Sequence, residues 1–232
     1  MLFRDMNKLA SNGMYFLSRI KDLFTDFLFP KSRKVLELEA LSAGVLLETL
    51  PPALRLKDKY TMALFDYSHP LVKEIIWELK YNGNVRIAEK LGEILYDHIR
   101  HELLDLALFE KWDKPILMPI PISDKRRFER GWNQSELLSE DVMKRDSEKI
   151  FRYMPRQLVK IRHTESQTKT ASRSERLGNL TNSMDVLNRV PVAGECVIVL
   201  DDVTTTGSTF VEARRALRAA GARKILCVAV AH

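Results

Sequence analysis

Apolar residues recur along this chain at the three- and four-residue intervals of amphipathic helices. The first such stripe covers residues 14–29 and stops at Pro30, which ends a helix. We expect it either to pack on the protein's own core or to contact a membrane surface or a partner. The same spacing predicts further helices within residues 31–50, 70–80, 87–99 and 210–220.

Short apolar runs between these helices predict strands at residues 61–67, 115–119, 197–200 and 224–231. Strands that alternate with helices predict an α/β fold, with a central, mainly parallel sheet flanked by helices. Pro51 and Pro52 mark a boundary between a small helical N-terminal region, residues 1–55, and an α/β domain, residues 60–232. Within that domain residues 154–184 are mostly polar, which is typical of a functional loop.

The strand at 197–200 is followed by two carboxylates, Asp201 and Asp202, and then by a loop of small residues that leads into the helix from Phe210. The loop consists of Thr204, Thr205, Thr206, Gly207, Ser208 and Thr209. Free backbone N–H groups and the positive end of the helix dipole favour an anion at such a place. Gly207 allows a phosphate to approach the backbone closely. The alternative is an Asp-rich turn that only caps the next helix.

The residue types in this segment suit a sugar phosphate. Hydroxyl side chains supply further donors to a phosphate, while Asp201 and Asp202 can accept hydrogen bonds from ribose hydroxyls, directly or through Mg²⁺. Both carboxylates would also stabilise positive charge at the anomeric carbon. The segment resembles the phosphoribosyl-pyrophosphate (PRPP) binding motif of type I phosphoribosyltransferases.

A second candidate segment, residues 123–134, follows the strand at 115–119. We expect it to form a basic, glycine-containing loop, with a helix resuming at about Ser135. Loops at the carboxyl ends of parallel strands line the ligand crevice, and arginine matches phosphate oxygens well. The candidate residues are Arg126, Arg127, Arg130 and Gly131. The alternative is a solvated basic turn.

The net charge of +6 and a pI near 9.3 favour polyanionic partners, which include nucleotides, nucleic acid and membrane surfaces. The two cysteines, Cys196 and Cys227, lie in apolar runs, so we expect reduced, buried thiols. No uncharged run is long enough to span a bilayer, and no secretory signal is evident. We expect a cytoplasmic protein.

Four segments together resemble the ComF family of competence-associated, phosphoribosyltransferase-like proteins. They are LKYNGN (79–84), PIPISDKRRFERGWNQSELL (119–138), RHTESQTKTASRSERLGNL (162–180) and VIVLDDVTTTGST (197–209). The resemblance covers residue 60 to the C-terminus and implies a type I phosphoribosyltransferase-like fold. It implies that residues 204–209 hold a 5′-phosphate, that Asp201 and Asp202 hold the ribose as catalytic residues, and that the three arginines face pyrophosphate. It further implies a flexible loop with Gln167, Arg176 and Asn179, and a family motif at Lys80 and Tyr81 as a candidate substrate site.

Two functions are consistent with this resemblance. One is a phosphoribosyltransferase that uses PRPP with Mg²⁺ in pentosyl transfer, in DNA uptake or nucleotide metabolism. The other is a non-catalytic module that binds single-stranded DNA or a DNA-uptake protein through two basic stretches, the arginines at 126–130 and residues 152–176. Aromatic residues near those stretches could stack bases, although packing the core is their commoner role. They are Phe128, Trp132, Phe151 and Tyr153.

One feature departs from the family. ComF proteins commonly carry an N-terminal zinc ribbon with cysteine ligands, but this chain has no cysteine before Cys196. Four thiolate ligands cannot be assembled from the two cysteines present. We therefore expect residues 1–55 to be a metal-free counterpart of the ribbon, and we expect no zinc.

Overall fold

The computed structural model describes residues 32–161 and 182–232, and the helix expected at 14–29 lies outside these residues. The chain divides into two compact units, Met1–Ala40 and Leu41–His232. The described part of the first unit contains helix α2 (Arg33–Ala40). The second unit begins with a short helix, α3 (Ala43–Thr49), whose N-cap Ser42 accepts a hydrogen bond from the Val45 amide. Within the described residues no helix is long and apolar enough to cross a membrane.

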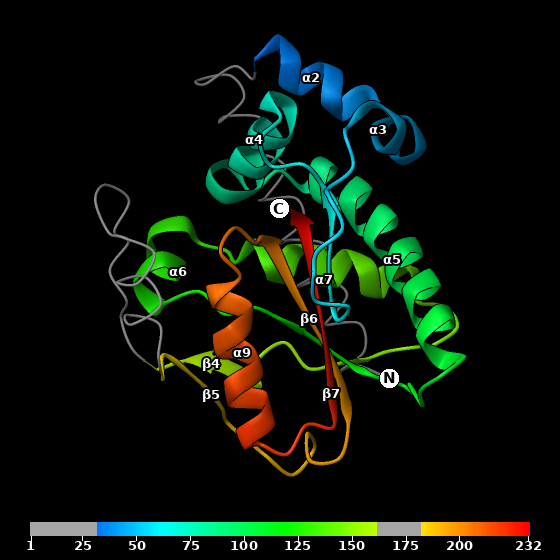
Figure 1. Ribbon diagram of the computed structural model, residues 1–232. Helices are drawn as coiled ribbons and strands as arrows, with labels where there is room; N and C mark the ends of the chain where they lie inside the picture. Colours follow the sequence, from blue (N-terminus) through cyan, green and yellow to red (C-terminus); the bar gives the residue numbers. More distant parts are fainter. Residues whose placement is uncertain (1–31, 162–181) are drawn as a thin grey trace, which may run out of the picture. The chain divides into compact units, whose positions relative to one another are not determined.

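The core of the second unit is a five-stranded parallel sheet with the order β1-β7-β6-β2-β3 (Figure 1). The strands are β1 (Thr61–Phe65), β7 (Lys224–Ala231), β6 (Cys196–Val203), β2 (Ile116–Pro119) and β3 (Arg152–Tyr153). The central strands β6 and β7 are buried along nearly their whole length, which explains their continuous apolar runs. Because every pair is parallel, all strands end at the same edge of the sheet.

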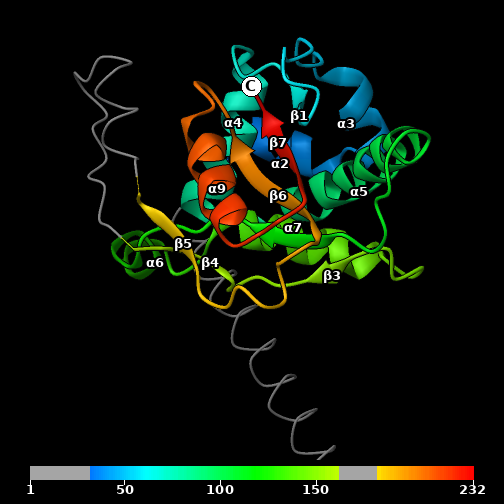
Figure 2. The ribbon, with the colours of Figure 1, turned by 60° about the horizontal axis from the view of Figure 1, so that its bottom comes forward.

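Different elements cover the two faces of the sheet (Figures 1 and 2). Helix α9 (Ser208–Ala219) packs on one face together with an antiparallel ribbon, β4 (Leu158–Lys160) and β5 (Met184–Val186). Val197 and Val199 of β6 share a buried cluster with Phe210 and Leu217 of α9. Helices α5 (Val85–Ala107) and α7 (Gln134–Arg145) pack against each other and contact the central strands. The expected α/β class with a parallel, helix-flanked sheet is confirmed.

Residues 123–134 do not form the expected loop. Residues Asp124–Arg130 form helix α6, and helix α7 begins at Gln134. The N-cap Ser123 accepts a hydrogen bond from the Arg126 amide, and Gly131 ends α6 in the left-handed conformation at φ 84°. A side-chain cap and a run of charged helix formers therefore outweigh the turn signal of the glycine.

Helix α4 (Pro70–Trp77) is followed by a single π-helical turn, η1 (Glu78–Asn82), where the sequence predicts an α-helix as far as about Lys80. Gly83 ends this turn at φ 56°, and Asn84 caps α5. A π-turn places its side chains differently from an α-helix and is frequent at functional sites. Here it contains both residues of the Lys80–Tyr81 motif.

The other differences concern short or extended strands. Strand β6 runs beyond the predicted end at Leu200 and includes both aspartates, and α9 begins two residues earlier than expected. The expected polar loop at 154–184 contains β4 and the first residue of β5. Strands of two or three residues, like β3, β4 and β5, are too short for a periodic signal, so the sequence pattern misses them.

Candidate functional site

The candidate site begins at the carboxyl end of β6, where Asp201 and Asp202 are both buried. They lie within the strand, and Asp201 is in register with Ala229 of β7. Pairing with neighbouring strands therefore holds the backbone of both residues in place. The amide of Asp202 also donates to Oδ1 of Asp201 over 2.9 Å.

The N-terminus of α7 provides hydrogen-bond donors to both carboxylates. Ser135 Oγ donates to Asp201 Oδ1 over 3.0 Å, and Gln134 Nε2 donates to Asp202 Oδ1 over 3.4 Å. Asn133 anchors this end of the helix, since it accepts from the Ser135 amide and donates to the Ile120 carbonyl oxygen. Gln134 and Ser135 are not among the site residues that the sequence predicts. Their position directly after a buried strand and a basic segment is the signal that could have identified them.

Lys80 of the π-turn is the counter-ion of this pair. Its Nζ lies 2.9 Å from Asp202 Oδ2. Burial lowers the pKa of Lys80, but the carboxylates raise it by more, so the pKa lies above its ordinary value and the ammonium stays charged. This geometry gives the family motif at Lys80 a place in the site that the sequence alone could not supply.

The surroundings of Asp201 disfavour its ionised form. Burial, and then the neighbouring charge of Asp202, raise the pKa of Asp201 well above its ordinary value. One ammonium faces two buried carboxylates, so the pair tends to retain a proton on Asp201 while Asp202 is held by Lys80. The site therefore offers acceptor oxygens for hydroxyl groups and attracts added positive charge.

The loop at 204–209 follows directly and connects β6 to α9. Thr204 is buried, and its amide donates to the Ala231 carbonyl oxygen, so the loop starts from a fixed point. Thr206 Oγ1 and Ser208 Oγ share a hydrogen bond of 2.8 Å. Gly207 is the N-cap of α9 at φ 74°, and apart from its chain neighbours no heavy atom of the described residues lies within 4 Å of the position that a Cβ would occupy. The loop thus presents open space at a helix N-terminus, as an anion requires.

The basic residues of α6 do not act as one group. Arg127 forms an ion pair with Glu136 of α7. Arg130 Nη1 donates to Gln134 Oε1 over 3.4 Å, and its guanidinium lies over the Tyr81 ring, 5.1 Å from the centroid. Through Gln134, Arg130 is thereby connected to Asp202. Gly131 serves as the end of α6 and has open space around it.

Lys160 of β4 is a further site residue that the sequence analysis did not single out. Burial lowers its pKa, the charge of Arg126 lowers it further, and the Asp201 carboxylate opposes this shift. Lys160 is therefore within electrostatic reach of both Arg126 and Asp201. Its only sequence signal is the basic stretch in which it stands.

The aromatic candidates separate into two kinds. Phe128 is 93% exposed, whereas Phe151 is buried and packs edge-on against Tyr96. Trp132 Nε1 donates to the Leu79 carbonyl oxygen, which gives that ring a structural role beside the π-turn. The predicted loop residues Gln167, Arg176 and Asn179 lie outside the described residues.

No family model matches the chain. Among solved structures, the chain is similar to the glutamine PRPP amidotransferase from B. subtilis complexed with ADP and GMP. That similarity has 17% identity and a TM-score of 0.37 and covers 67% of this chain and 30% of that one. The allosteric regulatory enzyme of purine biosynthesis shows 18% identity and a TM-score of 0.34, over 62% of this chain and 25% of that one. TM-scores this low do not establish a shared fold.

The sequence relatives are more informative. DNA utilization protein YhgH of Escherichia coli O157:H7 is 30% identical over 190 residues, which cover 80% of this chain and 75% of that protein. Competence protein F of Haemophilus influenzae is 29% identical over 164 residues, or 68% of this chain and 66% of that protein. With this identity and coverage, the chain belongs to the ComF family, that of competence protein F and DNA utilization protein YhgH.

Proposed function

We propose that this protein binds PRPP, or a related ribose 5-phosphate compound, together with Mg²⁺ at the carboxyl edge of its sheet. The observation that carries the proposal is the buried pair Asp201–Asp202, which directly precedes an open, glycine-capped helix N-terminus. Acceptors for sugar hydroxyls and donors for a phosphate thus stand next to each other in the chain. We further propose a cytoplasmic location and a role in DNA uptake or nucleotide metabolism.

The donor set fits Mg²⁺. This ion prefers oxygen ligands and is commonly bound through one or two carboxylates plus the phosphates of a substrate. The carboxylates of Asp201 and Asp202 face a single ammonium, that of Lys80, so additional positive charge is favourable there. When bound, the ion would neutralise charge on the pyrophosphate group.

The residues of this chain would then have separate tasks. The loop at 204–209 would bind the 5′-phosphate, and Lys80 would hold the Asp202 carboxylate in place as an acceptor for a ribose hydroxyl. In a transfer reaction, the bond from the anomeric carbon to pyrophosphate breaks, pyrophosphate leaves with the electron pair, and an amine or base nitrogen forms the new bond and loses its proton. The acidic pair would stabilise the positive charge at that carbon, and Arg126 and Arg130 of α6 would bind the leaving group.

Substitution of the two aspartates tests this proposal. We expect Asp202→Asn to weaken Mg·PRPP binding by about 1–3 kcal/mol, because a charge-assisted hydrogen bond is lost. Asp201→Asn should weaken Mg·PRPP binding by less than Asp202→Asn does, because asparagine resembles the protonated form that the raised pKa of Asp201 favours. Isothermal titration calorimetry measures both, with Asp185→Asn on the exposed side of β5 as the matched control. If wild type fails to bind at millimolar PRPP, or if all three variants bind alike, the proposal is wrong. Pyrophosphate release with a panel of bases and amines then tests turnover separately.

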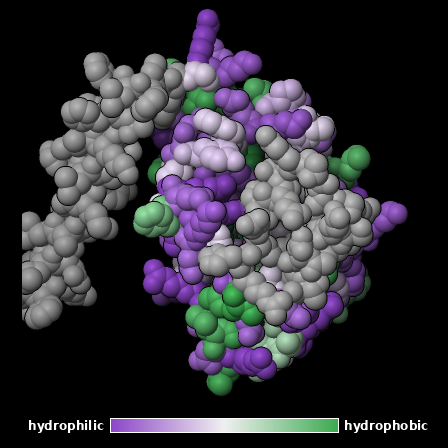
Figure 3. Space-filling model, turned by 90° about the vertical axis from the view of Figure 1, so that its left-hand side faces the viewer, coloured by the Kyte–Doolittle hydropathy of each residue, from purple (hydrophilic) through white to green (hydrophobic). Residues whose placement is uncertain are grey.

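Binding of single-stranded DNA is a second candidate function. The observation that favours it is Phe128, which is almost fully exposed on α6 between basic residues. The described surface on the side of α6 and α9 is also largely hydrophilic (Figure 3). Exposed aromatic rings beside arginines can stack bases while the charges contact phosphates.

For this function we expect the affinity for an oligothymidylate to fall steeply between about 50 and 200 mM salt. Proteins that make many phosphate contacts lose about 10³-fold or more in affinity over this range. Phe128→Ala should weaken binding at every salt concentration, and Arg126→Glu should also flatten the salt dependence. Arg100→Glu, a charge reversal on α5, is the control. Fluorescence anisotropy provides the measurement, and an affinity indifferent to salt and to both variants would exclude this function.

A further inference from the structure

A cluster of basic residues lies at the opposite edge of the sheet from the aspartates. A cavity of about 280 Å³ opens there between the end of α9 and the starts of β1 and β7. Lys224 at the start of β7 pairs in register with Cys196, five residues before Asp201, so this cavity lies about 16 Å along the strand from the acidic pair. Its polar lining consists of Asp58, Tyr60, Arg214, Arg218, Arg223 and Lys224.

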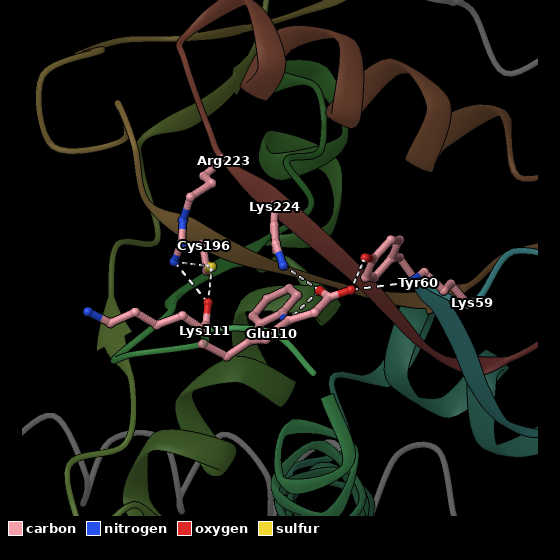
Figure 4. Close-up of polar contacts among 8 residues, drawn as sticks. Lys59, Tyr60, Glu110, Lys111, Cys196, Arg223 and Lys224 are labelled. Carbon is pink, nitrogen blue, oxygen red and sulfur yellow. Dashed lines mark hydrogen bonds and ion pairs between the residues drawn. The ribbon is translucent and has the colours of Figure 1, made fainter. Parts of the chain in front are cut away.

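Two of the four cationic lining residues are held by carboxylates. Arg214 forms an ion pair with Asp58 and donates to Thr61 Oγ1 over 2.9 Å. Lys224 Nζ lies 2.6 Å from Glu110 Oε2 (Figure 4). These contacts fix the walls of the cavity, and neither cation needs a ligand to be stable.

Glu110 does not neutralise its surroundings. Its Oε1 also accepts from the Tyr60 hydroxyl over 2.6 Å and lies 3.2 Å from Lys59 Nζ (Figure 4). Hydrogen bonds from Lys224 and then from Tyr60 lower the pKa of Glu110 to about 2, so it carries one negative charge at neutral pH. This single charge faces two ammonium groups, and the group as a whole remains positive.

Arg223 is oriented by neutral acceptors. Its Nη2 donates to the Lys111 carbonyl oxygen over 2.9 Å and to Cys196 Sγ over 3.1 Å (Figure 4). Burial raises the pKa of the Cys196 thiol, which therefore stays neutral. The guanidinium is thus fixed in position, and these two contacts leave its charge uncompensated.

Arg218 adds a second uncompensated charge. It is exposed on the last turn of α9, and within residues 32–161 and 182–232 it forms no ion pair. Counting Lys59, the cavity and its rim bring five cationic side chains together with two carboxylates, those of Asp58 and Glu110. Two of the five are arginines, Arg218 and Arg223, which have no carboxylate partner among the described residues. Arginine forks of this kind bind phosphate oxygens through paired hydrogen bonds.

We propose that the cavity lined by Arg218, Arg223 and Lys224 is a second anion site, which binds a phosphoryl group independently of the loop at 204–209. The phosphoryl group can come from the backbone of a nucleic acid strand or from a small phosphate compound. Both sources present the same oxygens to the same three side chains. The inference does not depend on PRPP binding, because it concerns the other edge of the sheet.

The experiment uses the full chain and two probes, inorganic pyrophosphate in calorimetry and a fluorescent oligothymidylate in anisotropy. Both are measured in the Gly207→Val background, so that any binding of the probes at the loop at 204–209 is reduced. We expect Arg218→Glu to weaken the binding of pyrophosphate at least tenfold. Arg223→Gln should act in the same direction, and Arg100→Glu on α5 is the charge-matched control.

The two probes identify the source of the phosphoryl group. If Arg218→Glu weakens both probes, the site accepts a nucleic acid backbone. If it weakens pyrophosphate alone, the site accepts small phosphate compounds, and either result supports the proposal. Thermal melting shows whether each variant is folded, and Arg218 is the safest position because it is exposed and makes no ion pair. If neither probe responds to Arg218→Glu or to Arg223→Gln in folded protein, the proposal is overturned. Such a failure would leave PRPP binding at the aspartates untouched.

Discussion

We expect Gly207→Val to abolish the binding of Mg·PRPP in calorimetry and to leave the chain folded. This is the largest effect that we expect at the loop at 204–209. Gly207 has φ 74°, a conformation that a β-branched residue adopts only with strain. The space around its missing Cβ is open, so the Cβ of a valine would meet no atom of the described residues beyond its chain neighbours. It would instead stand where a phosphate must approach the backbone at the start of α9.

The control for this prediction separates backbone strain from lost binding. Gly194 also has positive φ, 77°, and open space around the Cβ position, but it lies in the turn before β6, at the other end of that strand. Gly194→Val should therefore lower the melting temperature by a similar amount and leave PRPP affinity unchanged. Equal PRPP affinity of wild type and Gly207→Val would show that the phosphate does not bind at this loop.

The second large effect is on stability. Lys80→Met removes the ammonium that faces Asp202 and keeps a side chain of similar length. We expect the free energy of unfolding at pH 8 to fall by about 3–5 kcal/mol, because removing one partner of a buried ion pair leaves the other charge uncompensated. The pKa of Asp201 is raised, so its contribution to stability is present below the ordinary pKa of 3.8 and is lost as the pH rises through the folded-state value. The penalty of Lys80→Met should therefore be smaller at pH 5 than at pH 8.

Urea unfolding at the two pH values measures this effect, with Lys73→Met on the exposed side of α4 as the control. Lys80 is charged throughout this range, because its raised pKa means that its contribution is lost only in more alkaline solution. Adding Asp201→Asn to Lys80→Met should restore part of the stability at pH 8, since one of the two buried charges is then absent. A penalty below about 0.5 kcal/mol, or one that grows toward pH 5, would contradict the role of Lys80 as counter-ion.

The parts of the site that the sequence could predict are those that are local in the chain. A buried strand, an acidic pair and a glycine-containing loop before a helix are adjacent from residue 197 to 209, so their order predicts their arrangement. The strand at 224–231 was likewise predictable, because a long apolar run in a parallel sheet has few alternatives. Helix α6 was not, because its seven residues are too few for a periodic pattern and its glycine suggested a loop.

What the sequence by itself determined is the α/β class and the position of a glycine-containing loop after Asp201 and Asp202. What only the tertiary structure decided is which distant side chains meet that pair. Lys80 comes from a π-turn, and Ser135 and Gln134 come from the start of α7. The same holds for the basic cavity at the other edge, where Glu110 meets Lys224 and the Lys111 carbonyl oxygen meets Arg223. The physical reason is that such contacts depend on strand order and helix packing, which join residues far apart in the chain, whereas periodicity and turn chemistry act only between near neighbours.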